Sequence, residues 1–376
     1  MTQSLAVRAI TPQDHLRFIR AQRSASFLQT PAWGVVKSEW RSQSIGWFDA
    51  DELVGVGLVL LRQLPRMGKH LAYLPEGPLL DWTTDDLASW LDPMVDHLRA
   101  GGAFAVRVGP PVAVRRWSAD AVKAGLAAPL VLRLDDIAPT ERSADGALVL
   151  SELGELGWLR QGAGAGFTAG QPRFNFQIPL AGRTEADVLA AMNQQWRRNI
   201  KRADKAGVVV TGSSDGGVPL DLKAFHDLYV HTAERDHFTP RPLAYFDTMF
   251  RALGAEEDDR IRLYAARHDG ELVAATVAVR VGAHTWYSYG ASSTTKRDVR
   301  GSNAIQWRMI RDALAAGCDV YDLRGITDTL DPDDPHAGLI QFKVGTGGEA
   351  VEYAGEWDLP LNRLLYKAFS LYLSRR

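Results

Sequence analysis

The stretch DADELVGVGLVLL, residues 49–61, decides the fold, because RHDGELVAATVAV at residues 267–279 has the same layout. In each stretch, turn residues such as Asp and Gly lie between two strand-forming segments, and a β-branched run follows the turn. Each stretch therefore predicts an antiparallel hairpin. Internal repeats govern the architecture of a whole chain, and this one predicts that a single structural unit occurs twice.

Two more pairs of matching segments follow the hairpins in the same order. HLAY at residues 70–73 matches HTWY at residues 284–287, and each begins the next strand. HLRAGGAFAVRVG at residues 97–109 matches ALAAGCDVYDLRG at residues 313–325, where a helix end, a glycine-containing stop and a strand succeed one another. We therefore predict an α/β fold with mixed sheets, as two tandem copies of helix, hairpin, further strand, helix and strand. One large mixed sheet is the disfavoured alternative.

The composition is that of a folded protein with more than one domain. The 376 residues are 46% hydrophobic and 23% charged, with a net charge of −2, so no overall charge attracts nucleic acid or lipid. The single cysteine, Cys318, excludes an internal disulfide framework and fits a reducing compartment. The N-terminus does not have the order of a signal peptide, and no apolar run approaches the roughly 20 residues that span a bilayer. We expect a cytoplasmic protein.

One predicted helix, residues 186–208 (ADVLAAMNQQWRRNIKRADKAGV), is strongly basic. Residues four apart lie one above the other on a helix, so its five cations gather on one side. They are Arg197, Arg198, Lys201, Arg202 and Lys205. A phosphate backbone would compensate these charges and release counterions on binding. A solvated helix face, paired with local acids, explains the spacing equally well.

Two further cations stand where an anionic ligand is one explanation. In ERDHFTPRPLAYF, residues 234–246, Arg241 lies between two prolines that present it from a loop, and Tyr245 follows about one helical turn later. The planar guanidinium suits phosphate or carboxylate, although a structural salt bridge is the simpler explanation. In FLQTPAWGVVKSEW, residues 27–40, Lys37 lies on a predicted helix, where a lysine is usually just solvated.

A basic turn that feeds a helix, residues 288–314 (SYGASSTTKRDVRGSNAIQWRMIRDAL), is similar to the pyrophosphate-binding turn of CoA-dependent acetyltransferases. That motif begins with Gln or Arg and ends with Gly or Ala. Aligned on Gly301, this chain has Asp298 first and Asn303 last. Because Asp298 would repel the pyrophosphate, the turn argues against CoA as the donor.

Six segments taken in order resemble the FemABX family of non-ribosomal peptidyltransferases. They are FLQTPAWGVVK, YLPEGPLLDW, WRRNIKRADKAGV, RPLAYF, WYSYGASS and FKVGTGG, and they extend over most of the chain. Members of that family use aminoacyl-tRNA to add the bridge amino acids of bacterial peptidoglycan. The resemblance implies aminoacyl-tRNA as the donor and UDP-MurNAc-pentapeptide or its lipid-linked form as the acceptor. No cofactor or metal ion is expected.

The same resemblance implies two acetyltransferase-like (GNAT-like) domains without a coiled-coil arm. The first would comprise residues 1–172 plus 356–376, because the C-terminal segment returns to it, and it would bind the acceptor. The second would comprise residues 173–355 and form the tRNA and catalytic side. A Gly-rich stretch within residues 143–180 suits the crossing between them.

Roles at the acceptor side follow from the resemblance. Lys37 and Arg241 match positions that hold the acceptor's diphosphate, and Tyr245 matches an acceptor-contacting tyrosine. Tyr287 or Tyr289 matches an aromatic residue near the reaction centre. We further expect the basic helix to be the surface that binds the tRNA body.

Phe342 and Lys343 match the pair that faces the 3′ end of the tRNA. They lie in GLIQFKVGTGGEAVEY, residues 338–353, which predicts a loop whose glycines let RNA approach the backbone. Phe342 would stack on a terminal base, and the Lys343 ammonium would face developing negative charge or the terminal phosphate. The alternative for Lys343 is a surface lysine on a β-turn.

One departure from the family leaves other functions open. Many relatives carry an acid just before the proline in FAVRVGPPV, where this chain has Gly109, so a carboxylate base is missing there. A CoA-dependent N-acyltransferase shares the fold, and a tRNA-dependent transferase acting on protein N-termini shares the donor chemistry. A noncatalytic protein that binds tRNA or a wall precursor is the third alternative.

The C-terminal stretch LPLNRLLYKAFSLYLSRR, residues 359–376, alternates apolar and basic residues at helical spacing. Contact with the inner face of the plasma membrane, where a lipid-linked acceptor resides, is one interpretation. Packing against the first domain is favoured, because the apolar residues make a normal core stripe. They are Leu364, Leu365, Phe369 and Leu373.

Overall fold

The computed structural model describes residues 5–64, 67–162, 170–213, 217, 219, 221–334 and 337–374, with side chains up to residue 371. They form a mixed α/β fold that divides into two units. Unit 1 consists of Met1–Arg116, Glu141–Arg173 and Glu352–Arg376. Unit 2 consists of Trp117–Thr140 and Phe174–Val351. None of the described helices combines the length and apolarity that crossing a bilayer requires.

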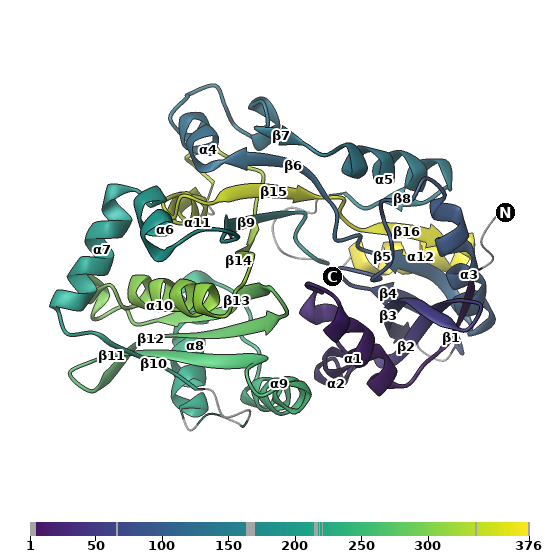
Figure 1. The fold of residues 1–376 in the computed structure, drawn as a ribbon, viewed down its shortest axis with the longest axis horizontal. Coiled ribbons are helices and arrows are strands. Elements are labelled where there is room, and N and C mark those ends of the chain that lie inside the picture. Colours follow the sequence, from purple (N-terminus) through teal and green to yellow (C-terminus); the bar gives the residue numbers. More distant parts are fainter. Residues whose placement is uncertain are drawn as a thin grey trace. The chain divides into compact units, whose positions relative to one another are not determined.

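Unit 1 is built on a sheet with the strand order β1-β2-β3-β4-β5-β16-β8 (Figure 1). The strands are β1 (Ala6–Ala9), β2 (Arg41–Asp49), β3 (Glu52–Gln63), β4 (His70–Leu74), β5 (Ala103–Val108), β8 (Leu159–Arg160) and β16 (Trp357–Pro360). β2 and β3 form the predicted hairpin, in which Asp49 lies opposite Glu52. β3 pairs antiparallel with β4, and β4 runs parallel to β5.

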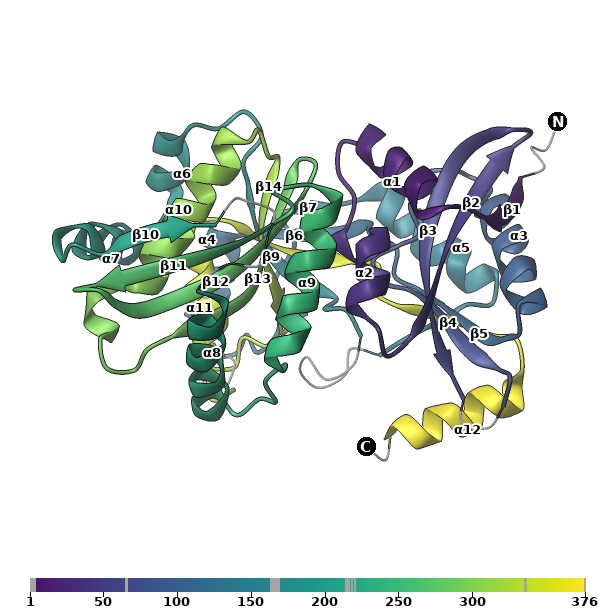
Figure 2. The same cartoon turned by 90° about the horizontal axis from the view of Figure 1, so that it is seen from below.

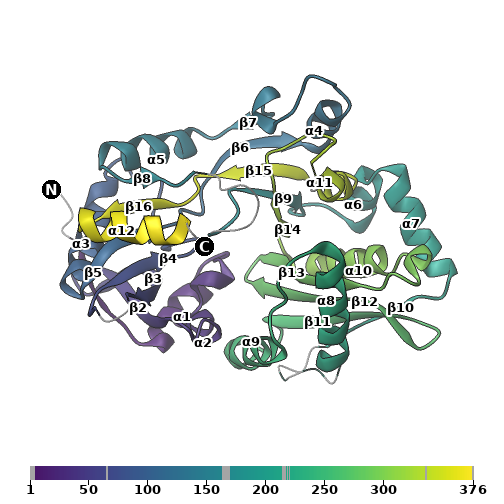
Figure 3. The same cartoon turned by 180° about the vertical axis from the view of Figure 1, so that it is seen from behind.

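The helices of unit 1 include α1 (Pro12–Ala21), α2 (Pro31–Val36), α3 (Leu87–Ala100), α5 (Ala144–Glu155) and α12 (Arg363–Ser374). The C-terminal helix α12 packs on β5 (Figure 3). The ring of Phe369 lies 5.4 Å from that of Phe104. Leu364 is 82% exposed, so the predicted core stripe is wrong at this residue. Five residues correspond to about 140° around a helix, so burying Phe369 turns Leu364 outward.

The second sheet has the strand order β10-β11-β12-β13-β14-β9-β15-β6-β7. Its strands are β6 (Ala113–Ser118), β7 (Glu141–Arg142), β9 (Phe174–Pro179), β10 (Val209–Gly212), β11 (Ile261–His268), β12 (Glu271–Val281), β13 (His284–Ser292), β14 (Val320–Ile326) and β15 (Glu349–Tyr353). β11 and β12 form the second predicted hairpin, β12 pairs antiparallel with β13, and β13 runs parallel to β14.

Helices cover the β11–β13 part of the second sheet on both faces (Figure 2). α8 (Leu222–Asp236) and α9 (Leu243–Glu256) lie on one face, and α10 (Gly301–Ala315) lies on the other. The remaining helices of unit 2 are α4 (Ala119–Leu126), α6 (Glu185–Ala191), α7 (Gln194–Lys205) and α11 (Ala337–Val344).

The two units repeat the same strand sequence, as predicted. In each unit an antiparallel hairpin is followed by a third antiparallel strand and then by a parallel strand that a helix precedes. The matching histidines take equivalent places, because His70 lies opposite Ala103 and His284 opposite Val320. The alternative of one large sheet is therefore wrong.

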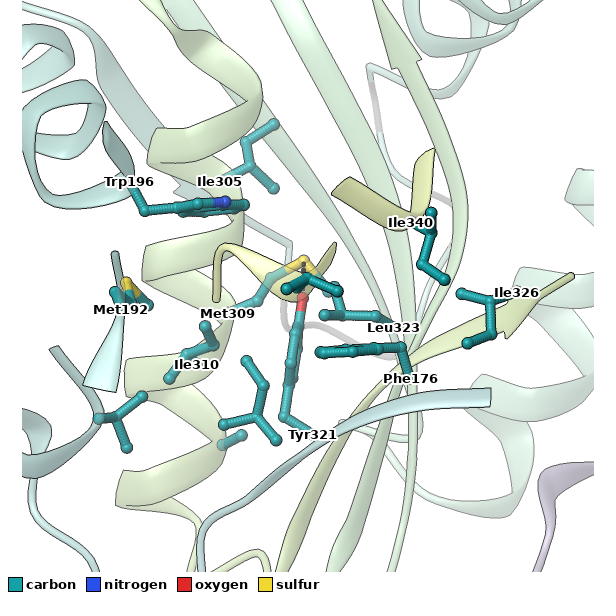
Figure 4. Close-up of a cluster of buried hydrophobic side chains, with 14 of the residues drawn as sticks. Phe176, Met192, Trp196, Ile305, Met309, Ile310, Tyr321, Leu323, Ile326 and Ile340 are labelled. Atoms are coloured by element: carbon teal, nitrogen blue, oxygen red, sulfur yellow. Dashed lines mark hydrogen bonds between the residues drawn. The ribbon is translucent and has the colours of Figure 1, made fainter. Parts of the chain in front are cut away.

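The core of unit 2 lies between α10, α7 and strands β9 and β14. Trp196, Met309, Tyr321 and Phe176 point toward one another there (Figure 4). Trp117, Val122 and Leu134 belong to the same buried cluster, which is why residues 117–140 group with unit 2. The expected boundary at residues 172 and 173 assigns that segment to the first domain instead.

The single basic helix predicted over residues 186–208 is interrupted in the structure. α6 ends before Met192, whose ψ of 144° is extended, and α7 begins after Asn193. The Asn193 side chain accepts a hydrogen bond from Trp196 N at 2.8 Å. An asparagine cap of this kind starts a new helix, so one helix becomes two.

Candidate functional site

A separation of two parallel strands marks the centre of the candidate site in unit 2. β13 and β14 pair only over His284–Trp286 and Val320–Asp322, although both strands continue further. On its other edge β14 pairs with β9, and the register shifts between Asp322 and Gly325. Arg324 in this bulge has a φ of 62°, a left-handed conformation that is uncommon outside glycine. The bulge takes carbonyls of β14 out of the regular ladder.

Asp322 anchors the bulge from inside the protein. It is 2% exposed, and its carboxylate accepts hydrogen bonds from Arg324 N at 2.5 Å and Gln177 Nε2 at 2.8 Å. His284 Nε2 lies 3.4 Å from Asp322 Oδ2. Burial alone would raise the pKa of Asp322, but His284, Arg324 and Gln177 together lower it. The residue is therefore a buried carboxylate anion.

Lys343 points at the bulge from the last turn of α11. Its side chain is 4% exposed, and Nζ donates hydrogen bonds to the carbonyls of Arg324 at 3.1 Å and Gly325 at 2.7 Å. Burial lowers the pKa of Lys343 to about 7, while the charge of Asp322 acts in the opposite direction. Near neutral pH this group is present both as ammonium and as amine. The predicted loop at this position is wrong, and so is the alternative of a surface lysine, because the residue is helical and buried.

The glycines after Lys343 make room for the protein's own chain. A Cβ at Gly345 would overlap the Trp196 ring, and one at Gly347 or Gly348 would overlap a backbone carbonyl. Gly345 O also accepts a hydrogen bond from Asn193 N at 2.9 Å. The expectation that these glycines leave space for RNA is therefore wrong, since α6, α7 and β9 occupy that space.

Phe342 links the site to the basic helix. Its ring lies 4.8 Å from the Trp196 ring, and its carbonyl accepts a hydrogen bond from Trp196 Nε1 at 2.9 Å. Trp196 lies in the first turn of α7, the helix that carries the cations. Phe342 and α7 therefore form one packed assembly beside Lys343.

Four of the five predicted cations of α7 are exposed: Arg198, Lys201, Arg202 and Lys205. Arg202 Nη2 lies 3.5 Å from Asp298 Oδ2. Within the described part of the chain, the other three have no acidic partner within ion-pair distance. Arg197 instead stabilises the end of α6, because its Nη1 donates hydrogen bonds to the carbonyls of Ala190 and Met192.

A second group of predicted residues meets where α8, α9 and β13 come together. The Tyr245 and Tyr289 hydroxyls lie 3.1 Å apart, and the Tyr289 ring packs edge-on against Phe246 at 5.1 Å. Arg241 is exposed, and its guanidinium lies 5.3 Å from the centre of the Tyr245 ring. No acid among the described residues pairs with Arg241, so the predicted alternative of a structural salt bridge finds no partner there.

The two candidate tyrosines of β13 have different surroundings. The pairing of β12 with β13 shifts register between the partners of Tyr287 and Tyr289. Tyr289 joins Tyr245, whereas Tyr287 packs against the buried cluster of unit 2. Burial raises the pKa of Tyr287 to about 12, and a Cβ at Gly290 would overlap its hydroxyl.

Unit 1 contains Lys37 and Gly109. Lys37 follows α2, its side chain is 18% exposed, and its Nζ lies 2.9 Å from Glu39 Oε1. A Cβ at Gly109 would lie 3.1 Å from Glu76 N, which is closer than ordinary contact. Glycine at position 109 therefore fits the tight packing of this backbone.

Sequence reasoning missed Asp322, Gln177 and Trp196. A charged residue within the otherwise apolar strand segment VYDL was a signal for Asp322. No comparable signal points to Gln177, because its partner is 145 residues away. Trp196 lies in the segment read for its cations, and nothing in its neighbours points to a contact with Phe342.

Comparison with known proteins gives a family and a fold. The FemAB family model matches residues 10–259 and 255–373. The lipid II:glycine glycyltransferase of Staphylococcus saprophyticus is 24% identical over 422 aligned residues, covering 95% of this chain and 94% of that protein. That of Staphylococcus haemolyticus is 23% identical, covering 95% of this chain and 93% of that protein.

Two solved structures share the fold. The crystal structure of FemX has a TM-score of 0.79 at 23% identity and covers 96% of this chain and 99% of its own. A tandem GNAT protein from the clavulanic acid biosynthesis pathway has a TM-score of 0.50 at 10% identity, covering 95% and 98%. The predicted fold class, two tandem GNAT-like domains, is confirmed. Across the described ranges the longest helices, α8 and α10, have 15 residues, too few for a coiled-coil arm.

Proposed function

The chain belongs to the FemAB family and is an aminoacyltransferase, and we propose that it transfers an amino acid from aminoacyl-tRNA to the side-chain amine of a peptidoglycan stem peptide. The family match along the chain and the lipid II:glycine glycyltransferase activity of its relatives support this proposal. The structural observation that carries it is the buried Lys343 amine, held where β13 and β14 separate.

The proposed reaction forms an amide bond and breaks an ester bond. The neutral acceptor amine attacks the ester carbon, and the carbonyl oxygen becomes an oxyanion in a tetrahedral intermediate. The ribose hydroxyl then leaves with a proton, while the attacking nitrogen loses one. Fixing the two reactants supplies roughly 7–11 kcal/mol, so an activated ester needs no strong carboxylate base. The glycine at position 109 is compatible with this chemistry.

Lys343 is assigned to the developing negative charge. An ammonium group has three N–H donors, and the carbonyls of Arg324 and Gly325 take two of them. The third is free to donate to the oxyanion or to the terminal phosphate of the tRNA. Phe342, packed on Trp196, is assigned to stacking on the terminal base.

The acceptor is assigned to the other predicted residues. Arg241, exposed and without an acidic partner in the described ranges, suits the diphosphate of UDP-MurNAc-pentapeptide or of the lipid-linked precursor. Tyr245, whose ring lies beside Arg241 and whose hydroxyl contacts that of Tyr289, is assigned to a contact with the same acceptor. In unit 1, Lys37 is the residue that we propose as a ligand of the diphosphate. Of the two tyrosines of β13, Tyr289 is the one beside these groups, and Tyr287 packs against the core of unit 2.

The tRNA body is assigned to the exposed face of α7. Its four exposed cations lie on the helix that Trp196 ties to Phe342. From Trp196 to Lys205 the helix rises about 14 Å, which leads a phosphate backbone away from the reaction centre. The unpaired charges of Arg198, Lys201 and Lys205 favour this assignment over a helix face neutralised by local acids.

A lipid-linked acceptor would bring the protein to the inner membrane surface. The outer face of α12 exposes Leu364 at 82% and Leu371 at 53%, and Arg363 and Lys367 are exposed beside them. Apolar residues flanked by cations suit a shallow contact with anionic lipid. We propose a peripheral contact through this face.

The decisive experiment supplies purified protein with a tRNA pool charged with labelled amino acids and with either form of the acceptor. The expected result is label on the acceptor, which identifies the amino acid. No label should appear when the tRNA is digested with ribonuclease before the reaction. Transfer from acetyl-CoA to an amine, with none from tRNA, would assign the chain to the CoA-dependent alternative. Binding of tRNA or precursor without any transfer would assign it to the noncatalytic one.

A further inference from the structure

We propose that Asp322 is a positioning residue for Lys343: its carboxylate holds the β14 bulge whose carbonyls receive the ammonium, and its negative charge favours the ammonium form. This inference rests on the proposed function, because it takes the ammonium of Lys343 to be the form that acts. It adds that a buried acid favours the charged form of Lys343, against the effect of burial. Both side chains are nearly inaccessible, at 2% and 4% exposure.

The geometry connects the two residues through the backbone. Asp322 Oδ1 accepts the hydrogen bond of Arg324 N at 2.5 Å, which closes a short turn around Leu323. Arg324 is thereby kept at a φ of 62°, and its carbonyl lies 3.1 Å from Lys343 Nζ. The next carbonyl, of Gly325, lies 2.7 Å from the same atom. Without the anchoring carboxylate, a non-glycine residue has little reason to hold this conformation.

Other contacts fix the carboxylate itself. Gln177 Nε2 from β9 donates to Oδ2 at 2.8 Å, and His284 Nε2 from β13 lies 3.4 Å from that oxygen. Asp322 is also the last residue of β14 that pairs with β13. The anchor therefore lies at the point where the strands part and the proposed chemistry begins.

Charges of both signs face Lys343. Asp322 raises the pKa of Lys343 and Arg324 lowers it, against the larger effect of burial. His284 Nε2 lies 3.4 Å from the carboxylate of Asp322. Removing the acid and removing the arginine should therefore change the ionisation of Lys343 in opposite directions. If Asp322 and Arg324 only supported the fold, removing them would not change the ionisation of Lys343 in opposite directions.

The test compares Asp322→Asn with Arg324→Gly. Asn keeps an oxygen acceptor for Arg324 N while removing the charge, and Gly readily adopts the left-handed conformation. Asp312→Asn is the matched control, because Asp312 accepts from Tyr264 and Arg308 instead. The Lys343 titration is followed by NMR of protein with ¹³C-labelled lysine, and its signal is identified by its loss in Lys343→Met.

We expect the titration midpoint of Lys343 to fall by about one pH unit in Asp322→Asn, to rise in Arg324→Gly and to stay unchanged in the control. Parallel shifts in the two variants, or none, would overturn the proposal. If Asp322→Asn does not fold, Asp322→Ser replaces it, because serine also keeps an oxygen acceptor for Arg324 N and lacks the charge, and a midpoint that fails to fall contradicts the proposal. The NMR result requires no transferase activity, so it separates this inference from the proposed function.

The pH dependence of transfer provides a second readout. If the ammonium acts in catalysis, the activity of Asp322→Asn relative to that of the unmodified protein should recover at lower pH, where Lys343 is protonated in both proteins. A loss of the same size at every pH would indicate that Asp322 only supports the fold. Absence of transfer in the unmodified protein would instead contradict the proposed function and leave the titration result standing.

Discussion

The strand pairs β4–β5 of unit 1 and β13–β14 of unit 2 occupy the same place in the repeated fold, yet only the second pair separates. β5 pairs with β4 along the whole of β4, from His70 to Leu74. β13 stops pairing with β14 after Trp286, although it continues to Ser292. The repeat thus preserves the architecture while one copy releases backbone groups from the sheet. In that copy the released carbonyls of Arg324 and Gly325 hold a lysine.

One cation beside each of these strand pairs, Arg107 in unit 1 and Lys343 in unit 2, differs in the same sense. Arg107 of β5 makes two hydrogen bonds to Asp358, at 2.6 and 2.8 Å, and lies 3.7 Å from Glu356. Lys343 of unit 2 is held by two neutral carbonyls. A cation matched by acids stabilises a fold, whereas one held by neutral groups is available for an anion that arrives with the substrate. Arg107 thus stabilises the fold of unit 1, and Lys343 is the cation that we assign to the chemistry of unit 2.

The largest expected effect is on the stability of unit 1. Arg107→Met leaves the buried carboxylates of Asp358 and Glu356 without their cation, which should cost about 3–5 kcal/mol in the free energy of unfolding. Urea denaturation measures the loss. Arg99→Met, which removes an exposed partner of Asp96, is the control and should change stability by less than about 0.5 kcal/mol. A small effect of Arg107→Met would remove the contrast between the units.

The next effect is on transfer by unit 2. Lys343→Met should lower the single-turnover rate about 100–1,000-fold, because one donor to the oxyanion is lost. Methionine has a similar length and suits a buried site, so the fold should persist, and circular dichroism checks it. Lys223→Met, at an exposed lysine paired with Asp227, should retain full activity. Equal rates for Lys343→Met and the unmodified protein would show that Lys343 has no part in the reaction.

A smaller effect is expected at the basic helix. Reversing two charges in Lys201→Glu/Lys205→Glu should weaken tRNA binding, and the slope of log affinity against log salt should fall by about two. Fluorescence anisotropy with labelled tRNA measures both quantities. Lys123→Glu/Lys223→Glu changes the net charge equally at exposed sites on other helices and should bind as the unmodified protein does. Identical losses in the two double variants would mean that net charge alone controls binding.

The sequence predicted the features that depend on neighbouring residues and missed those that depend on distant ones. The hairpins at residues 49–61 and 267–279 were predictable because a turn and its two strands are contiguous. The interruption of the basic helix at Asn193 was predictable in principle, since asparagine is a preferred cap. The burial of Lys343 was not, because it requires the bulge that the pairing of β14 with β9 creates. That pairing joins segments about as far apart as Gln177 and Asp322, 145 residues.

The smallest expected effect concerns pH and tests what kind of cation Lys343 is. The neutral fraction of a free acceptor amine rises about tenfold per pH unit below a pKa near 10.4, so kcat/KM should rise with pH in Lys343→Met. In the unmodified protein the ammonium of Lys343 is lost as pH rises through about 7, which opposes that rise. The kcat/KM of the unmodified protein divided by that of Lys343→Met should therefore be constant below pH 7 and fall above it. A ratio that increases through pH 7 would make Lys343 a proton acceptor instead, because the neutral amine would then be the active form.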